Sequence, residues 1–65
     1  MNLCDYYVEE VLSCPVFRGF DEDNIYWWEI EVSYYYDNGN LKTKKLTFDT
    51  EKEVNQVKKG FHFTA

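Results

Sequence analysis

Two glutamates, Glu29 and Glu31, are the residues whose spacing could serve acid–base chemistry. They lie two positions apart, so on a β-strand both carboxylates would point to the same side. Paired acids can act as general acid and base, but a catalytic site also needs further polar partners. The single histidine, His62, is far away in the sequence, and Cys4 and Cys14 carry no motif of a nucleophile. We therefore predict that both glutamates lie on a solvated face and that the protein is not an enzyme.

Metal and cofactor sites lack their ligand patterns as well. The acidic segment 21–24 carries oxygen ligands but not the spacing of a calcium-binding loop. The two cysteines form no C-x-x-C pair and lie far from His62, so a zinc site is not expected. Gly19, Gly39 and Gly60 do not form a phosphate-binding loop. The sequence predicts no metal and no cofactor.

The chain has 65 residues, which suits one domain, residues 1–65, near the lower size limit. Cores this small often rely on disulfides, metals or partners. No basic segment followed by an apolar run opens the sequence, and no apolar run is long enough to span a membrane. We expect a cytoplasmic protein with reduced cysteines and no membrane contact; a Cys4–Cys14 disulfide is the alternative.

The net charge of -5 is unevenly distributed along the chain. Residues 1–37 contain nine acids and one arginine, which sum to −8, whereas residues 38–65 contain three acids and six lysines, which sum to +3. Such asymmetry concerns partners more than fold. Either it serves solubility, or it forms an acidic face that competes for a basic groove.

Segment 25–36 alternates as a β-strand does when one of its faces is buried. Its odd positions are mixed, with glutamates in the middle, which suits the solvent side. Its even positions are all apolar or aromatic: Tyr26, Trp28, Ile30, Val32, Tyr34 and Tyr36. This segment is therefore predicted to be a half-buried strand.

A hairpin is expected between this strand and a second one over 41–48. A three-residue loop, 37–39, sets Ile30 opposite Leu46 and matches both faces, whereas a loop one residue shorter would not. The same loop places Gly39 at a left-handed position, which glycine adopts without strain.

The segment after residue 48 has the features of a helix. Asp49 or Thr50 can cap its start, Gly60 can end it, and Val54 and Val57 can bury one side. The fold class that follows is α+β: a small antiparallel β-sheet of three or more strands with one C-terminal α-helix packed on one face.

Residues 3–14 fit both a helix and a strand, because glutamate and leucine favour the first and tyrosine and valine the second. We prefer the strand, since two strands and one helix make a poor core. As a strand, it would present one largely apolar face: Tyr6, Val8, Leu12 and Cys14. Segment 17–24 is expected to be a loop, and 61–65 a short edge strand or a segment beside the helix.

The order strand, Asn-Gly turn, lysine-bearing strand and helix over 28–60, with the stretch YYYDNGNLKTKKLTFDTEKEV, resembles the arm-type DNA-binding module of phage integrases. That family implies a three-stranded sheet in the DNA major groove. The residues that would contact nucleic acid are Lys42, Lys44 and Lys45. The family carries basic residues on several strands, whereas the strand beside these lysines carries Glu29 and Glu31. A net charge of -5 also opposes phosphate binding. A nucleic-acid-binding accessory module is therefore our alternative hypothesis.

Protein binding is the preferred hypothesis. Trp27 and Tyr35 point away from the predicted core, and aromatic residues beside carboxylates suit a contact surface for a basic partner. Alternatively, the N-terminal segment, or Phe17 and Phe20, cover both side chains. The predicted contact set comprises Trp27, Glu29, Glu31 and Tyr35 on the strand, and Asp21, Glu22 and Asp23 in the adjoining loop.

In size, acidity, composition and lack of catalytic groups, the chain is similar to small early proteins of bacteriophages. Many of those proteins bind and block a host protein, and some, including anti-CRISPR proteins, imitate DNA through spaced carboxylates. The likeness implies an inhibitor of a host protein with a basic nucleic-acid-binding groove. A homodimer closed by an exposed strand edge or by aromatic side chains is a further hypothesis.

Overall fold

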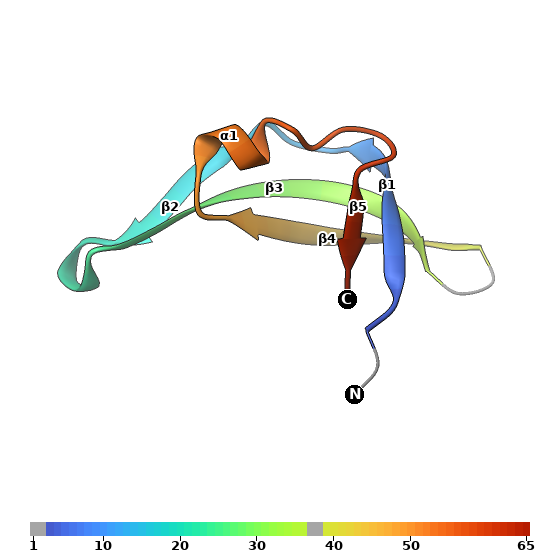
Figure 1. Ribbon diagram of the computed structural model, residues 1–65, viewed down its shortest axis with the longest axis horizontal. Helices are drawn as coiled ribbons and strands as arrows, with labels where there is room; N and C mark the ends of the chain where they lie inside the picture. Colours follow the sequence, from blue (N-terminus) through green and yellow to red (C-terminus); the bar gives the residue numbers. More distant parts are fainter. Residues whose placement is uncertain (1–2, 37–38) are drawn as a thin grey trace.

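The computed structural model describes residues 3–36 and 39–65 (Figure 1). This part of the chain folds into strands that all pair in the antiparallel sense, together with one short helix. In chain order the elements are β1 (Asp5–Val11), β2 (Val16–Phe20), the 3-10 turn η1 (Asp21–Asp23), β3 (Ile25–Tyr36), β4 (Asn40–Phe48), α1 (Glu51–Val54) and β5 (His62–Thr64).

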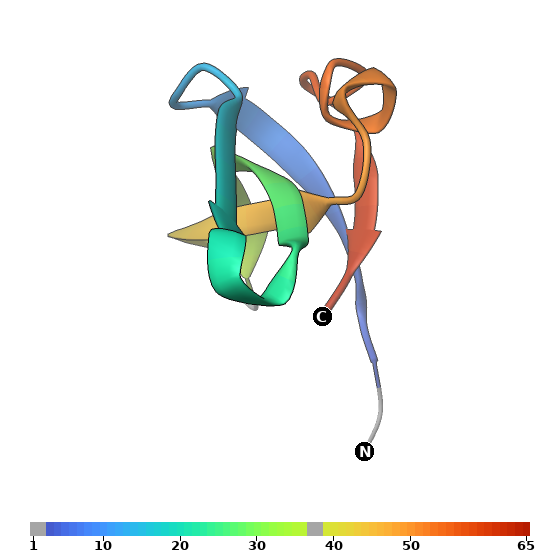
Figure 2. The same ribbon diagram turned by 90° about the vertical axis from the view of Figure 1, so that its left-hand side faces the viewer.

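The longest strand, β3, is the centre of the sheet. β4 pairs with one edge of β3, while β1 and β2 pair one after the other with its opposite edge. The first half of β1 pairs with β5 instead. Figures 1 and 2 show that β3 is bowed, and that α1 and the loop after it lie on the same side of the sheet as β5.

The predicted alternation of β3 is confirmed in the middle of the strand, where the even positions Ile30, Val32 and Tyr34 are buried. Towards the ends of the strand, Tyr26 and Tyr36 are 43% and 38% exposed, although Phe17 stacks on the first ring and Tyr6 lies 5.8 Å from the second. The buried core comprises Val8, Ile30, Val32, Tyr34, Leu46, Val54, Val57 and Phe63.

The register of the β3–β4 hairpin is also confirmed. Ile30 lies opposite Leu46, and Glu31 lies opposite Lys45. Gly39 has a φ of 82°, the left-handed conformation that the three-residue loop requires. The other two loop positions, 37–38, lie outside the described residues.

The predicted fold class is wrong, because the chain is mostly antiparallel β-sheet, with 59% strand and 11% helical residues. The helix starts as expected, since Thr50 Oγ1 accepts a hydrogen bond from the Glu53 amide at 3.2 Å. It ends at Val54, however, and the chain then turns back to β1, where the Gly60 amide donates to the Val8 carbonyl at 2.8 Å. Strand pairing at β1 therefore replaces the later helical turns, and Gly60 serves a turn with a φ of 90° rather than a helix end.

Strand structure near the N-terminus and over 62–64 is confirmed by β1 and β5. The predicted face of the first strand is only half right. A register shift between Val8 and Glu10 reverses the alternation, so Val11 packs against the core while Leu12 is 43% exposed. Cys14 is exposed as well, and both cysteines are free thiols.

The loop predicted over 17–24 is wrong in its first half, because residues 16–20 form β2. The structure gives the reason: this segment pairs with β3, and Gly19 lies under the ring of Tyr26. A Cβ at this glycine would be 2.3 Å from Tyr26 Cδ1. Among the described residues, no helix is long and apolar enough to cross a membrane.

Candidate protein-binding surface

The β2–β3 hairpin forms one end of the molecule's long axis, at the left of Figure 1. The turn between the strands is η1, followed by Asn24 in the left-handed conformation with a φ of 54°. Asparagine tolerates this conformation better than most residues. All residues of β2 and η1 are exposed, so the hairpin reaches beyond the core.

This hairpin carries five aromatic side chains, which we call the aromatic hairpin patch. They are Phe17, Phe20, Tyr26, Trp27 and Trp28. Phe17 stacks on Tyr26 with ring centroids 5.5 Å apart, and it lies 5.1 Å from Trp28. On the other face, Phe20 lies 5.5 Å from Trp27. These contacts order the rings, yet Phe17 remains 55% and Phe20 60% exposed.

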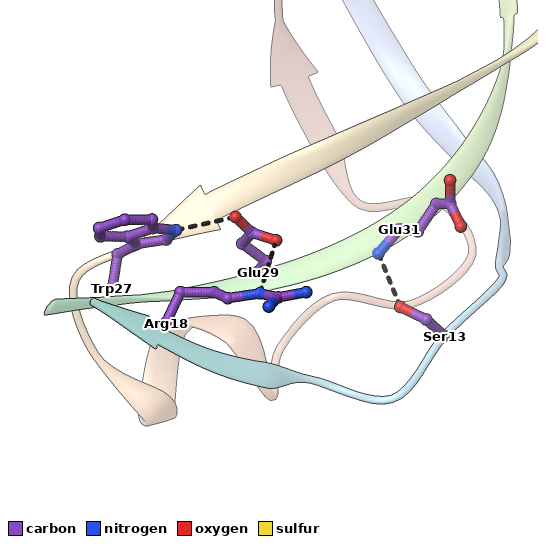
Figure 3. Close-up of polar contacts among 5 residues, drawn as sticks. All are labelled: Ser13, Arg18, Trp27, Glu29 and Glu31. Carbon is purple, nitrogen blue, oxygen red and sulfur yellow. Dashed lines mark hydrogen bonds and ion pairs between the residues drawn. The ribbon is translucent and has the colours of Figure 1, made fainter. Parts of the chain in front are cut away.

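The carboxylate of Glu29 contacts two neighbouring side chains, and the Glu29 side chain is 19% exposed (Figure 3). Trp27 Nε1 donates a hydrogen bond to Glu29 Oε1 at 2.9 Å, and Arg18 Nε lies 3.5 Å from Glu29 Oε2. The indole donor holds the pKa of the Glu29 carboxyl below its ordinary value, against the opposing effect of partial burial. The charges of Arg18 and Lys45 act in the same direction as the indole.

The backbone of Glu31 in β3 is hydrogen-bonded to the segment that follows β1. Its backbone amide donates to Ser13 Oγ at 2.9 Å (Figure 3). Its carbonyl accepts from the Leu12 amide at 2.8 Å. Its side chain is half-buried and lies opposite Lys45 on the neighbouring strand. Glu29 thus makes its contacts through the carboxylate, whereas the hydrogen bonds of Glu31 to Ser13 and Leu12 are made by its backbone.

The residues of β3 that were predicted to form one contact surface lie in two separate places in the structure. Trp27 and Glu29 lie in the hairpin, whereas Tyr35 is eight positions further along the strand, roughly 26 Å away at an ordinary strand rise. Of the two aromatic side chains expected to point outward, Trp27 is half-buried beside Phe20, and Tyr35 is 54% exposed. The hairpin therefore collects only part of the predicted set.

The loop acids are at the tip of the hairpin. Asp21, Glu22 and Asp23 make up η1, and all three are exposed. The Tyr26 hydroxyl donates a hydrogen bond to Asp21 Oδ1 at 2.9 Å, so one of these acids contacts the aromatic hairpin patch. Negative charge and aromatic surface are consequently next to each other.

No protein-family model, curated protein or solved structure matches this chain. The likenesses to integrase arm modules and to phage inhibitors stay predictions. The function of the hairpin surface has to be inferred from its own geometry.

The lysines of β4 do not share one face. Lys42 and Lys44 lie opposite Tyr34 and Val32, on the side of the sheet that carries the core, and Lys45 lies opposite Glu31 on the other side. The Lys42 ammonium sits 4.1 Å from the centre of the Tyr36 ring. A single basic face for a phosphate backbone is thus missing from this strand.

A shallow depression lies beside the hairpin, where β3 and β4 approach α1. The residues that line it are Trp27, Thr47, Phe48, Asp49 and Glu53. An aromatic ring flanked by two carboxylates is a suitable environment for a lysine or arginine side chain. Within residues 3–36 and 39–65, no three histidine, cysteine or carboxylate side chains form a group that could hold a metal ion.

Sequence reasoning missed Phe17 and Phe20 as surface residues in their own right. They were considered only as cover for Trp27 and Tyr35. The signal that could have revealed them is the short run of residues 16–20, in which valine and two phenylalanines flank an arginine and a glycine. Such a run suits an edge strand, but the acidic, turn-forming character of 17–24 led to the prediction of a loop over the whole segment.

Proposed function

We propose that this chain is a protein-binding domain that captures a basic partner with its β2–β3 hairpin. The observation that supports the proposal is the aromatic hairpin patch, in which Phe17, Phe20 and Tyr26 stay exposed beside three acids. Clustered aromatic side chains that stay exposed on a small domain commonly mark an interaction site. Aromatic residues supply most of the contact energy in such sites, and surrounding charge supplies attraction and orientation.

The chemistry of the surface defines the partner class. The tip carries Asp21, Glu22 and Asp23, and the depression beside Trp27 is lined by two further carboxylates. A partner that presents arginine or lysine next to apolar surface complements both features. Nucleic-acid-binding grooves are rich in such cations, and an occupied groove is closed to nucleic acid. The proposal therefore extends to a phage-type inhibitor that binds a host protein in its nucleic-acid groove.

The charge of the loop can be tested with two matched double variants. Tagged protein is used to capture partners from a bacterial lysate, with and without nuclease, and the affinity of the retained protein is then measured at two salt concentrations. The test variant is Glu22→Gln with Asp23→Asn, which leaves the Tyr26–Asp21 contact intact. The control is Glu9→Gln with Glu10→Gln on β1, which removes the same charge elsewhere.

We expect the loop variant to weaken binding by about tenfold at low salt, with a smaller loss at high salt, because charge attraction is screened. The β1 control should bind almost as the parent does. Equal affinities of the two double variants would contradict the charge part of the proposal. Partners that are lost after nuclease treatment would indicate that nucleic acid bridged the contact.

The aromatic part has its own matched pair. Phe20→Ser removes an exposed ring from the hairpin, and Leu41→Ser removes an exposed apolar side chain from β4. Because both positions are more than half exposed, neither change should unfold the domain. We expect only Phe20→Ser to reduce partner affinity. A partner that binds both variants equally would show that the aromatic hairpin patch is not the contact.

A further inference from the structure

We propose that the partner is held by strand addition: an extended basic segment pairs with the outer edge of β2. This inference rests on the proposed function and specifies how the hairpin binds. In the part of the chain that the structure describes, β2 pairs with β3 on one side and with no strand on the other. An edge strand of this kind presents backbone donors and acceptors to an incoming strand.

Hydrogen bonding around Glu31 identifies the backbone groups of β2 that point outward. Both the amide and the carbonyl of Glu31 face the edge of β3 that β1 and β2 occupy. Because these directions alternate along a strand, Glu29, Trp27 and Ile25 face the same edge. Their partners in the β2 register are Val16, Arg18 and Phe20. The backbone amides and carbonyls of Phe17 and Gly19 therefore point away from β3.

The edge of β2 carries fewer charged side chains that discourage strand addition than the edge of β4 does. The opposite edge of the sheet, β4, carries Lys42, Lys44 and Lys45, and lysines on an edge strand discourage pairing. β2 carries a single cation, Arg18, which forms an ion pair with the Glu29 carboxylate. Pro15 lies before the strand and leaves its ladder intact. Of these two edges, the charged one is protected and the apolar one is open.

Side chains and charge select the kind of strand that fits. An added strand would place its side chains beside Phe17 on one face and beside Phe20 on the other, which favours β-branched or aromatic residues. At the end of β2 the chain enters the acidic turn η1, so the adjoining end of the added strand should be basic. A second copy fits less well, because it would bring a further net charge of -5.

The test uses short synthetic peptides of alternating valine and threonine, with paired lysines or paired glutamates at one end. Binding to the isotope-labelled full chain is followed by the NMR shifts and hydrogen exchange of the β2 amides. We expect the lysine peptide to slow exchange at Phe17 and Gly19 and to bind at least about tenfold more tightly than the glutamate peptide. Exchange at these two amides unchanged by saturating peptide, or equal binding of both peptides, would overturn the inference.

A pair of variants separates backbone pairing from side-chain contact. Phe17→Pro removes the outward amide together with the ring, whereas Phe17→Ala removes the ring and keeps the amide. We expect Phe17→Pro to bind the lysine peptide about tenfold more weakly than Phe17→Ala, roughly the effect of one backbone hydrogen bond. If the proline variant does not fold, N-methylation of the Gly19 amide in a chemically synthesised chain removes the same kind of donor.

The outcomes distinguish this inference from the function on which it rests. If the captured partner is lost with Glu22→Gln and Asp23→Asn but binds Phe17→Pro as well as Phe17→Ala, the hairpin binds a basic partner without strand addition. Protection of Phe17 and Gly19 in the absence of peptide, together with doubling of the sedimenting mass, would show that a second copy occupies the edge and would overturn the inference.

Discussion

At the scale of single residues, Glu29 illustrates why the position of a carboxylate in the sequence does not determine its use. Its two oxygens are divided between the indole of Trp27 and the guanidinium of Arg18, and its side chain is 19% exposed. Little of its negative charge is therefore offered to a partner. The acids of the hairpin tip have no such arrangement apart from the Asp21–Tyr26 hydrogen bond, so charge attraction is expected to come from them.

We predict that Trp27→Phe raises the pKa of Glu29 towards its ordinary value, because the indole hydrogen bond is the main cause of the lowered pKa. The folded-state pKa of Glu29 is depressed, so its ionised form stabilises the fold above the unfolded-state pKa. That contribution is lost as the pH falls through the folded-state pKa. The variant should therefore lose less stability on acidification than the parent. A carbon-detected NMR titration of Glu29, with denaturant unfolding at several pH values, measures both effects.

A second substitution serves as the control. Arg18→Gln removes the charge and the hydrogen bond by which Arg18 lowers the Glu29 pKa, so the Glu29 titration should shift in the same direction. An unchanged Glu29 titration in Trp27→Phe would show that the indole hydrogen bond does not govern this carboxyl.

At the scale of elements, the β2–β3 hairpin and the core differ in how they are held. β2 contains no buried residue, whereas β3 buries Ile30, Val32 and Tyr34 between β1, β4 and α1. Backbone pairing and a few ring contacts hold the hairpin, while apolar burial holds the centre. Segments with little buried surface open more easily than the core.

From this difference we predict faster hydrogen exchange in β2 than in the centre of β3. The amides of Val16, Arg18 and Phe20 pair with β3 and should still exchange at least about tenfold faster than those of Val32 and Tyr34, because opening the hairpin exposes little apolar surface. Native-state exchange followed by NMR measures both sets in one sample. Equal protection would show that the hairpin opens only when the whole domain unfolds.

At the scale of the whole molecule, the acidic and aromatic hairpin lies at one end of the long axis. The molecule measures 42 × 28 × 16 Å, and the aromatic hairpin patch with its acids occupies one end of the long axis. The lysines of β4 are spread over two faces of the sheet. The hairpin end therefore presents mostly negative charge next to apolar surface, with Arg18 paired to Glu29, whereas the lysines of β4 present no continuous basic face.

We predict that this chain does not bind duplex DNA, even at low salt. Three lysines on two faces cannot neutralise neighbouring phosphates together, and the net charge of -5 repels the backbone. A gel-shift titration at low salt, repeated with Lys42→Gln, Lys44→Gln and Lys45→Gln combined, tests this. A shift that weakens steeply with salt and disappears in the triple variant would instead support the nucleic-acid hypothesis.

The sequence by itself determined the parts of the fold that depend on neighbouring positions. The alternation of 25–36 and the matching pattern of 41–48 admit one register, because a slip of one residue would bury glutamate and expose leucine. The left-handed Gly39 and the cap at Thr50 are local features of the same kind.

Only the tertiary structure decided the parts that depend on distant segments. The helix ends at Val54 because Gly60 and Phe61 hydrogen-bond to Val8, a partner more than 50 positions earlier in the chain. β2 is a strand because β3 supplies its ladder and Tyr26 covers Gly19. Backbone pairing satisfies donors and acceptors across any sequence distance, so local propensity could reveal neither the open edge of β2 nor the aromatic hairpin patch beside it.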